Sequence, residues 1–494
     1  MSKKKLAVII VACIIVIIVV VYALSSPTVT FADPNLEAAI REAIGISEGP
    51  IYAKDLKGLR SLDAPGSGIS DLSGLEHCVN LTNVSLQRNQ ITNISPLSNL
   101  SNLTTVNLAG NLIYEFSPIS KLTGLTDLTL YSSGIKDVSF LSELTNLTEL
   151  GLADNQISDL APLSELTNLT GLDLEGNHQI SDISPLTNLT SLTSLSLMVN
   201  QVTDVSALSN LTNLTFLTLE SNRVTDISPL ANLHKLSCLI LVDNQISDFS
   251  PLSELTNLTR LYLGYNQIND ISFLSGLTNL TSLGLIKNEI SDISVLAELT
   301  ELADLNLWSN RINDISPLSN LTSLTGLSLS SNPITDISPL YNLTGLNSLS
   351  LSDLPQISDF SLVANFSGLT HLSLAGNLVN DASIVSNLTD LSELYLYDNL
   401  IADISPLSNL TSLTSLWIKN NEISDISPLS NLINLTSLWI ANNQISDISP
   451  LVDNHGLGEG DEVDLRDNPL SSDSISIYIP QLEARGVDVN YLKC

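Results

Sequence analysis

Few residues in this chain of 494 could carry out catalysis or bind a metal. It has five histidines and four cysteines, and no two histidines have the spacing of metal ligands. His77 and Cys78 are adjacent, and Cys238 follows His234 by four residues, but no pattern of bases and carboxylates typical of a catalytic site surrounds them. The sequence also lacks a phosphate-binding loop and a nucleophile elbow. We therefore expect no enzyme activity, no metal and no cofactor.

A recurrent aspartate is the second candidate for chemistry. If the repeats stack about 4.8 Å apart, its carboxylates form a column of like charges that could bind calcium. The local sequence Ser-Asp-Ile-Ser favours the alternative, in which each carboxylate accepts a hydrogen bond from a backbone N–H of its own turn. The aspartates of this column are Asp137, Asp159, Asp182, Asp204, Asp226, Asp248, Asp270, Asp292, Asp314, Asp336, Asp359, Asp381, Asp403, Asp425 and Asp447.

Aromatic residues at regular spacing are the strongest candidates for ligand binding. Tyr395, Trp417 and Trp439 follow one another at steps of 22 residues, and Tyr397 lies beside the first of them. Tryptophan and tyrosine are enriched where binding energy is concentrated. We expect the rings of this column to stack on neighbouring strands, and the alternative is cross-strand packing that only stiffens a sheet. A second group consists of Phe216, Tyr262, Tyr265 and Trp308.

The element that positions these residues is a repeat of the form Leu-x-x-Leu-x-Leu-x-x-Asn. It occurs 18 times, mostly at intervals of 22 residues, and this period and pattern are the signature of a leucine-rich repeat. The ninth position is Asn89, Asn111, Ser133, Asn155, Asn177, Asn200, Asn222, Asn244, Asn266, Asn288, Asn310, Asn332, Leu354, Asn377, Asn399, Asn421, Asn443 and Asn468.

Each repeat predicts a strand followed by a turn. Leu150 and Leu152 alternate with polar or small residues, which is typical of a strand with one buried face. Ile157, Leu160 and Leu163 then recur at three-residue spacing, as in a 3₁₀ turn. We therefore predict an α/β solenoid, a leucine-rich-repeat horseshoe with parallel β-strands on the concave face, 3₁₀ or irregular turns on the convex face, and a helical N-terminal cap. The third, fifth, seventh and eighth motif positions should face the concave surface.

The ends of the array predict caps, because the first and last repeats of a solenoid need cover. Asp33 and Pro34 form a helix start and Gly45 a stop, so residues 25–66 are expected to be an N-terminal helical cap. Residues 67–470 should hold the array of about 18–19 repeats. Residues 471–494 should form a C-terminal cap.

Residues 1–24 form a separate segment. Three lysines precede an uncharged apolar run from Leu6 to Leu24, which is close to the length needed to span a bilayer. The run is either a transmembrane anchor or a cleaved signal, and residues 10–13 also resemble a lipoprotein cleavage box. Every interpretation exports the rest of the chain, as a single-pass membrane protein or a secreted one. We expect membrane contact through residues 6–24 only.

Charge excludes some partners. The formal net charge is −33, which argues against binding to nucleic acid or to anionic lipid through basic residues. A partner with positive charge is favoured by the acidic residues around the aromatic column, which are Glu393, Asp398, Glu462, Asp464 and Asp467.

The repeats resemble those of internalins, which are bacterial surface proteins with 22-residue repeats. The resemblance is carried by segments such as Leu166–Leu174 (LTNLTGLDL) and Asn421–Leu429 (NEISDISPL) and by the helical start before the first repeat. It covers about residues 31–470 and implies the same repeat fold and a surface location.

These patterns together predict an extracytoplasmic recognition or adhesion protein. We expect it to bind a protein or glycan on its concave face through Tyr395, Tyr397, Trp417 and Trp439, or through the group from Phe216 to Trp308. The alternative is a passive scaffold of the cell envelope with no specific ligand.

Overall fold

The computed structural model of the chain describes residue 14 and residues 27–492. The chain divides into two compact units, residues 1–235 and 236–494, and each is described by itself. Apart from Ile14, the apolar run expected to be an anchor or signal lies outside the described residues. Within the described part of the chain, no helix combines the length and the apolar character needed to cross a membrane.

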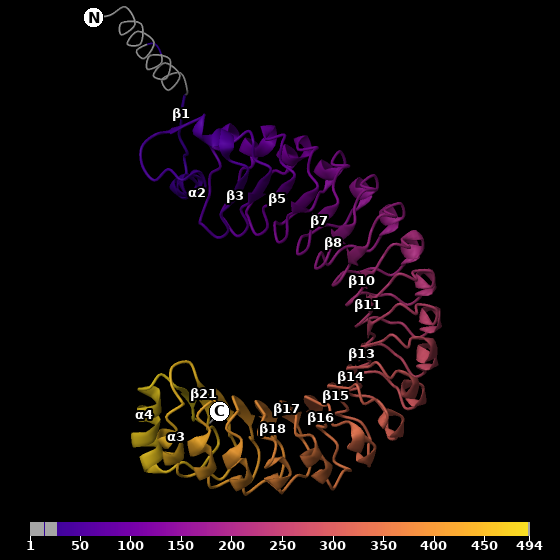
Figure 1. Cartoon of the computed structure of the whole chain (residues 1–494), viewed down its shortest axis with the longest axis vertical. Coiled ribbons are helices and arrows are strands. Elements are labelled where there is room, and N and C mark those ends of the chain that lie inside the picture. The colour runs from indigo at the N-terminus through magenta and orange to yellow at the C-terminus, as the bar shows by residue number, and fades with distance from the viewer. Residues whose placement is uncertain (1–13, 15–26, 493–494) are drawn as a thin grey trace, which may run out of the picture. The chain divides into compact units, whose positions relative to one another are not determined.

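Both units are built from the same repeat, which we call a rung. In each unit the strands lie on the concave side and the short helical turns on the convex side (Figure 1). We call the exposed side of the strands the inner face and the side of the helical turns the outer face. The expected leucine-rich-repeat solenoid is thereby confirmed in each unit.

The first unit begins with a helical cap and continues as a parallel sheet. Strands β1 (Thr28–Val29) and β2 (Ile51–Tyr52) pair antiparallel, and helix α2 (Pro34–Ile44) lies between them in the sequence. The strands of the parallel sheet are β3 (Ser61–Asp63), β4 (Asn83–Ser85), β5 (Thr105–Asn107), β6 (Asp127–Thr129), β7 (Glu149–Gly151), β8 (Gly171–Asp173), β9 (Ser194–Ser196) and β10 (Phe216–Thr218). The 3₁₀ turns are η1 (Asp55–Gly58), η2 (Leu75–His77), η3 (Ser95–Asn99), η4 (Ser117–Lys121), η5 (Ser139–Leu141), η6 (Ala161–Leu163), η7 (Ser184–Leu186), η8 (Ser206–Asn210) and η9 (Ser228–Leu230).

The second unit repeats this arrangement and ends in a mixed helical segment. Its parallel strands are β11 (Cys238–Ile240), β12 (Arg260–Tyr262), β13 (Ser282–Gly284), β14 (Asp304–Asn306), β15 (Gly326–Ser328), β16 (Ser348–Ser350), β17 (His371–Ser373), β18 (Glu393–Tyr395), β19 (Ser415–Trp417), β20 (Ser437–Trp439), β21 (Glu462–Asp464) and β22 (Asp488–Asn490). The 3₁₀ turns are η10 (Ser250–Leu252), η11 (Ser272–Gly276), η12 (Ser294–Glu298), η13 (Ser316–Leu318), η14 (Ser338–Asn342), η15 (Ser361–Asn365), η16 (Ala382–Val385), η17 (Ser405–Asn409) and η18 (Ser427–Asn431). The remaining helices are α3 (Ser449–Asp453), the π-helical turn η19 (Ser474–Tyr478) and α4 (Ile479–Glu483).

The parallel sheets extend slightly beyond the range expected for the array. β3 lies within the range expected for the N-terminal cap, and β22 lies within the range expected for the C-terminal cap. Both strands are in register with the neighbouring strand, so the first and last rungs are part of the sheet.

The core consists of columns of leucine and isoleucine. Leu150 and Leu152 of one rung point inward from the strand, and Ile157, Leu160 and Leu163 point inward from the turn, all at most 3% exposed. Because a single rung has no second apolar layer, it buries these side chains only against the rungs on either side. This packing keeps the strands in register at every step.

A buried asparagine at the ninth motif position joins each rung to the one before it. The side-chain amide of Asn266 donates to the carbonyl oxygens of Leu263 (3.2 Å) and Gly264 (3.1 Å) in its own rung, and of Leu241 (2.9 Å) in the previous rung. Its Oδ1 accepts from the N–H of Ile246 at 3.2 Å. We call the series of these side chains the asparagine ladder.

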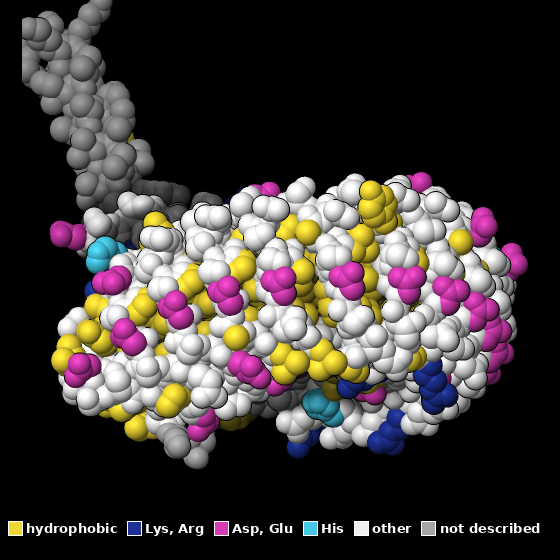
Figure 2. Space-filling view, turned by 90° about the horizontal axis from the view of Figure 1, so that it is seen from below, with side chains coloured by type: hydrophobic (Ala, Val, Ile, Leu, Met, Phe, Trp, Pro, Cys, Tyr) yellow, Lys and Arg dark blue, Asp and Glu magenta, His cyan; other side chains and the backbone are white. Residues whose placement is uncertain are grey.

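The recurrent aspartates cap their own turns. In every case Oδ1 accepts from the backbone N–H two residues later at 2.8–2.9 Å. Hydrogen bonds from the following serine lower the pKa of several of these carboxyl groups, among them Asp336 and Asp359. Figure 2 shows acidic side chains at even intervals along the outer surface that faces the viewer. The described residues contain no group of three or more side chains arranged to hold a metal ion.

Asp33 connects helix α2 to the first rungs. Its Oδ1 accepts from the N–H groups of Asn35 (2.8 Å) and Leu36 (3.2 Å) as the helix N-cap. Its Oδ2 accepts from the N–H (2.7 Å) and hydroxyl (2.9 Å) of Ser70 and from the N–H of Asp71 (3.2 Å). Burial alone would raise the pKa of Asp33, but the hydrogen bonds from Ser70, Leu36 and Asp71 lower it to about 2.

The asparagine ladder predicts the effect of Asn266→Ala. The substitution leaves three carbonyls and one N–H without their partner, so the free energy of unfolding should fall by about 1–3 kcal/mol. We expect the lower end, because Ser133 and Leu354 interrupt the ladder elsewhere. Urea unfolding measures the change, and Gln267→Ala, on the exposed neighbour, should stay within about 0.5 kcal/mol of wild type. An unchanged midpoint for Asn266→Ala would contradict the role of the ladder.

The contacts of Asp33 predict an acid-dependent loss of stability in the N-terminal cap. The pKa of Asp33 is about 2 in the folded protein and near 3.8 in the unfolded chain. The stabilisation of the folded cap by this carboxylate is therefore complete above about pH 4 and disappears as the pH falls towards 2. At pH 6, Asp33→Asn should destabilise the cap by about 2 kcal/mol, and the difference should vanish near pH 2. Hydrogen exchange of the α2 amides measures this, and a difference that persists at pH 2 would refute the assignment.

Candidate functional site

The structure brings four of the predicted site residues together on the inner face of the second unit. Tyr395, Trp417 and Trp439 end strands β18, β19 and β20, and their Cα atoms pair directly in the sheet register. Tyr397 lies two residues beyond Tyr395. We call these four residues the aromatic column.

The rings of the aromatic column contact one another, although not all in the way expected. Trp417 and Trp439 stack, with centroids 4.7 Å apart and planes inclined by 17°. Tyr395 instead meets Trp417 edge-on, at 5.3 Å and 86°, and the prediction of stacking is wrong for this pair. Tyr397 is tilted against Trp417 at 6.4 Å. The edge-on geometry turns the hydroxyl of Tyr395 toward Glu393, to which it donates a hydrogen bond of 2.5 Å.

A hollow opens beside the aromatic column. Its volume is about 470 Å³, and it lies over strands β16 to β19. It exists because the fifth motif position is serine in two successive rungs, at Ser350 and Ser373, and then becomes aromatic at Tyr395 and Trp417. The residues that line it are Ser348, Leu349, Ser350, His371, Leu372, Ser373, Glu393, Tyr395, Tyr397 and Trp417.

Hydroxyl groups form the floor of the hollow. Ser350 hydrogen-bonds to Ser330 at 2.7 Å, and Ser373 hydrogen-bonds to Ser352 at 2.6 Å. Ser330 also accepts from the backbone N–H of Ser352 at 2.8 Å. The floor is therefore polar but already hydrogen-bonded within the protein, whereas the wall is aromatic.

A histidine and a glutamate stand at the rim of the hollow, and the glutamate was named in the sequence analysis only as part of the acidic surroundings. Nε2 of His371 lies 3.4 Å from Oε1 of Glu393, and Nδ1 of His371 is 2.8 Å from the hydroxyl of Thr370. The other carboxylate oxygen of Glu393 accepts from Tyr395, and burial together with this carboxylate raises the pKa of Tyr395 to about 12. The signal was present, because His371 and Glu393 both occupy the third motif position of successive rungs.

The indole N–H of Trp417 has no hydrogen-bond acceptor. Nε1 is buried and finds no partner among the described residues. A buried donor without an acceptor destabilises a protein by about 1–3 kcal/mol. Native proteins keep few such groups, and each calls for a physical explanation.

The second aromatic group is closed by one of the chain's own lysines. Nζ of Lys287 lies 4.8 Å from the ring centre of Tyr265 and 4.9 Å from that of Trp308. Trp308 donates its indole N–H to Ser331 at 3.1 Å, and the hydroxyl of Tyr262 hydrogen-bonds to a serine at 2.9 Å. The indole N–H of Trp308, the hydroxyl of Tyr262 and one face each of the rings of Tyr265 and Trp308 are thus used within the protein. Phe216, also predicted for this group, is half-buried on β10 in the first unit.

The two cysteine positions considered for catalysis are buried free thiols. Burial, with a smaller effect of Glu76, raises the pKa of Cys78 to about 12, and burial also raises the pKa of Cys238. A thiol that keeps its proton at neutral pH is a poor nucleophile. Both positions therefore serve packing.

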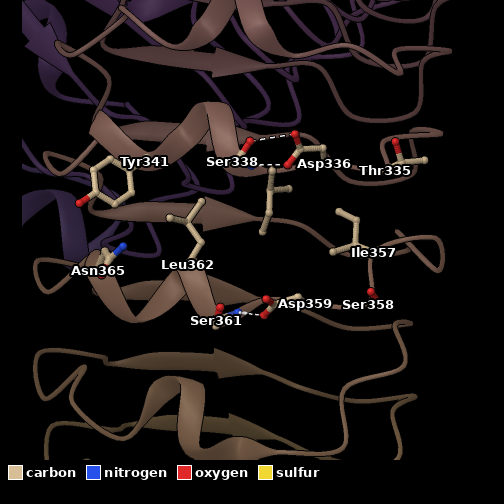
Figure 3. A pocket seen from close by; sticks show the side chains of 11 residues that line it. Thr335, Asp336, Ser338, Tyr341, Ile357, Ser358, Asp359, Ser361, Leu362 and Asn365 are labelled. Atoms are coloured by element: carbon tan, nitrogen blue, oxygen red, sulfur yellow. Dashed lines mark hydrogen bonds between the residues drawn. The ribbon is translucent and has the colours of Figure 1, made fainter.

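A groove on the outer face of the second unit is a weaker candidate. It lies between turns η14 and η15, and Figure 3 shows its side chains on these two turns and on the segments that precede them. Asp336 bonds to the N–H and hydroxyl of Ser338, and Asp359 bonds to the N–H of Ser361. Because the carboxylates are engaged in turn capping and only Tyr341 is a largely exposed aromatic side chain, the groove offers little for specific recognition.

Comparison with known proteins supports the repeat assignment. The sequence model of the family described as Leucine Rich repeats (2 copies) matches more than half of the chain in six segments. These are residues 145–188, 190–232, 234–276, 322–365, 367–409 and 411–453. No curated protein matches the sequence.

Solved structures share the fold. The internalin InlF from Listeria monocytogenes is 39% identical, with a TM-score of 0.64 over 65% of this chain and 96% of that chain. InlJ from the same organism is 24% identical (TM-score 0.51, 88% and 81% covered). The Arabidopsis receptor kinase HAESA, solved with the peptide hormone IDA and the co-receptor SERK1, is 21% identical (TM-score 0.58, 90% and 89% covered). The last two show the fold alone.

The family match covers the repeats that carry both the asparagine ladder and the aromatic column, and the similarity to InlF extends over nearly all of that protein. The chain therefore belongs to the leucine-rich-repeat family, and its repeats are of the internalin type.

Proposed function

We propose that this protein is an extracytoplasmic recognition protein that binds a protein ligand at the hollow and aromatic column of the second unit. The observation that carries the proposal is an aromatic wall beside an open hollow on the inner face. The repeat requires only leucine at the buried positions of each strand, so the clustered aromatic residues serve some other purpose.

The unsatisfied indole of Trp417 adds to this proposal. A peptide carbonyl that reaches Nε1 after a small shift of the ring would give this donor the acceptor that it lacks among the described residues. An extended segment of a partner supplies such carbonyls at regular spacing.

The shared fold is consistent with protein recognition. HAESA was solved with the peptide hormone IDA, and the plant receptor RGFR1 was solved with the peptide RGF2. These similarities concern the fold, so the position of the site in this chain rests on its own hollow and aromatic column. Neither the fold nor the site geometry favours an enzyme.

The competing interpretation is a passive scaffold of the cell envelope. In that case the aromatic column only stiffens the sheet by cross-strand packing. The contacts between Trp417 and Trp439 fit both interpretations, whereas the hollow beside them fits binding better.

We predict that Trp417→Ala combined with Trp439→Ala weakens ligand binding at least tenfold, because it removes the wall of the hollow. Peptides selected from a random display library on the wild-type protein provide the ligands, and titration calorimetry gives their affinities. The matched control, Tyr262→Ala with Trp308→Ala, removes two aromatic residues from the closed second group and should change the affinity less than twofold. Circular dichroism checks that each variant remains folded.

Other outcomes of this selection decide between the alternatives. Loss of binding in the control but not in the column variant would place the site at the second aromatic group. A library that yields no peptide, together with a glycan array that yields no sugar, would favour the scaffold.

The proposed extracytoplasmic location has its own test. If residues 6–24 export the chain, protease added to intact cells should digest residues 27–492 while a cytoplasmic marker stays intact. Protection of the body of the chain in intact cells, with digestion after lysis, would contradict this location.

A further inference from the structure

We propose that the hollow over β16–β19 binds a basic side chain, arginine or lysine, of the partner protein. This inference rests on the function proposed above and specifies which chemical group enters the hollow. Three features support it: the charges around the hollow, the position of Lys287 between rings of the second aromatic group, and the ring faces that remain open.

The charge of the hollow suits a cation. Glu393 stands at its rim with a side chain that is 36% exposed, and none of the residues that line the hollow is lysine or arginine. Beyond the wall, burial raises the pKa of Tyr397, and the carboxylates of Asp353 and Asp398 raise it further, so both lie within electrostatic reach of this ring. An ammonium or guanidinium group that enters would therefore meet a carboxylate and the face of an aromatic ring.

The second aromatic group shows how this inner face accommodates a cation. There Lys287 places its ammonium group within 5 Å of two ring centres, those of Tyr265 and Trp308. In the aromatic column, Lys419 lies 5.4 Å from the ring centre of Tyr397. The side of Tyr395 that borders the serine floor has no such occupant among the hollow's lining residues. The hollow could therefore accommodate a cation, and none of its lining residues supplies one.

The geometry of the rings favours a basic side chain over a sugar. Sugar rings bind by lying flat on an indole face. Trp417 lies between its two neighbours in the column, with Trp439 stacked at 4.7 Å and Tyr395 edge-on at 5.3 Å. The open surfaces of the hollow are instead the ring of Tyr395, the carboxylate of Glu393 and a floor of hydroxyls that are already paired.

His371 holds the carboxylate in position before the ligand arrives. Its Nε2 faces Oε1 of Glu393 at 3.4 Å, on the side of the carboxylate away from the hydrogen bond with Tyr395. An incoming guanidinium group would compete with this contact, so a permanent positive charge at position 371 should block the ligand. His371 is therefore a positioning residue, and Glu393 is the residue that contacts the cation.

Three short peptides test the inference directly: acetyl-Gly-Arg-Gly-amide, its lysine analogue and its neutral citrulline analogue. They are titrated into the full chain carrying Trp308→Phe, so that the fluorescence reports only Trp417 and Trp439. We expect the arginine and lysine peptides to bind at least tenfold more tightly than the citrulline peptide. Glu393→Gln and His371→Lys should each remove this preference. Asp304→Asn, which removes a charge at the same motif position on β14, should change binding less than twofold.

The contradicting results are separate from those for the proposed function. Equal affinity for the arginine and citrulline peptides, or an unchanged preference in Glu393→Gln, would overturn the inference. So would a methyl glycoside that binds the hollow more tightly than the arginine peptide. The binding of library peptides could require Trp417 and Trp439 while their affinity stays the same when arginine is replaced by citrulline. In that case the proposed function stands and this inference fails.

Discussion

A buried asparagine that bonds to carbonyls of two successive rungs is the interaction on which the rest of this structure depends. The ladder and the apolar columns together bring neighbouring strands, most of them 22 residues apart, into register. Because both lie away from the exposed inner face, the repeat does not prescribe which side chains that face carries. The protein can therefore vary the inner face while the rungs stay the same.

The candidate site is a consequence of that freedom. A step from serine to aromatic residues at a single motif position places an aromatic wall beside the hollow. The same surface contains a second aromatic group in which Lys287 fills the space between two rings. The two clusters differ on their open side: Lys419 lies 5.4 Å from the ring centre of Tyr397 in the aromatic column, but no lysine or arginine lines the hollow beside Tyr395.

Much of this could be predicted from the sequence, because the repeat converts spacing into position. The leucine and asparagine positions predicted the buried columns and the ladder, and the Ser-Asp-Ile-Ser pattern predicted the turn caps, since both depend on contacts within a rung or between neighbours. The proximity of Tyr395, Trp417 and Trp439 followed in the same way.

The edge-on orientation of Tyr395 could not be predicted in this way, because it depends on a hydrogen bond to Glu393. The pairing of His371 with Glu393 could have been predicted from their 22-residue separation. It was overlooked because the histidines were considered only as catalytic or metal-binding residues. The role of Lys287 depends on side-chain rotamers, which no spacing reveals, and the division into two units has no counterpart in the repeat pattern.

If a partner covers the hollow and the aromatic column, it should shield these residues from solvent. Hydroxyl-radical footprinting of the protein with and without a selected peptide measures this shielding. Tyr114 and Tyr341, at 85% and 63% exposure, serve as internal references that should react equally in both samples. The account predicts that Tyr395, Tyr397, Trp417 and Trp439 become protected when the peptide is bound, while Tyr265 does not change. Unchanged reactivity of the aromatic column in the complex, or protection confined to Tyr265 and Trp308, would contradict it.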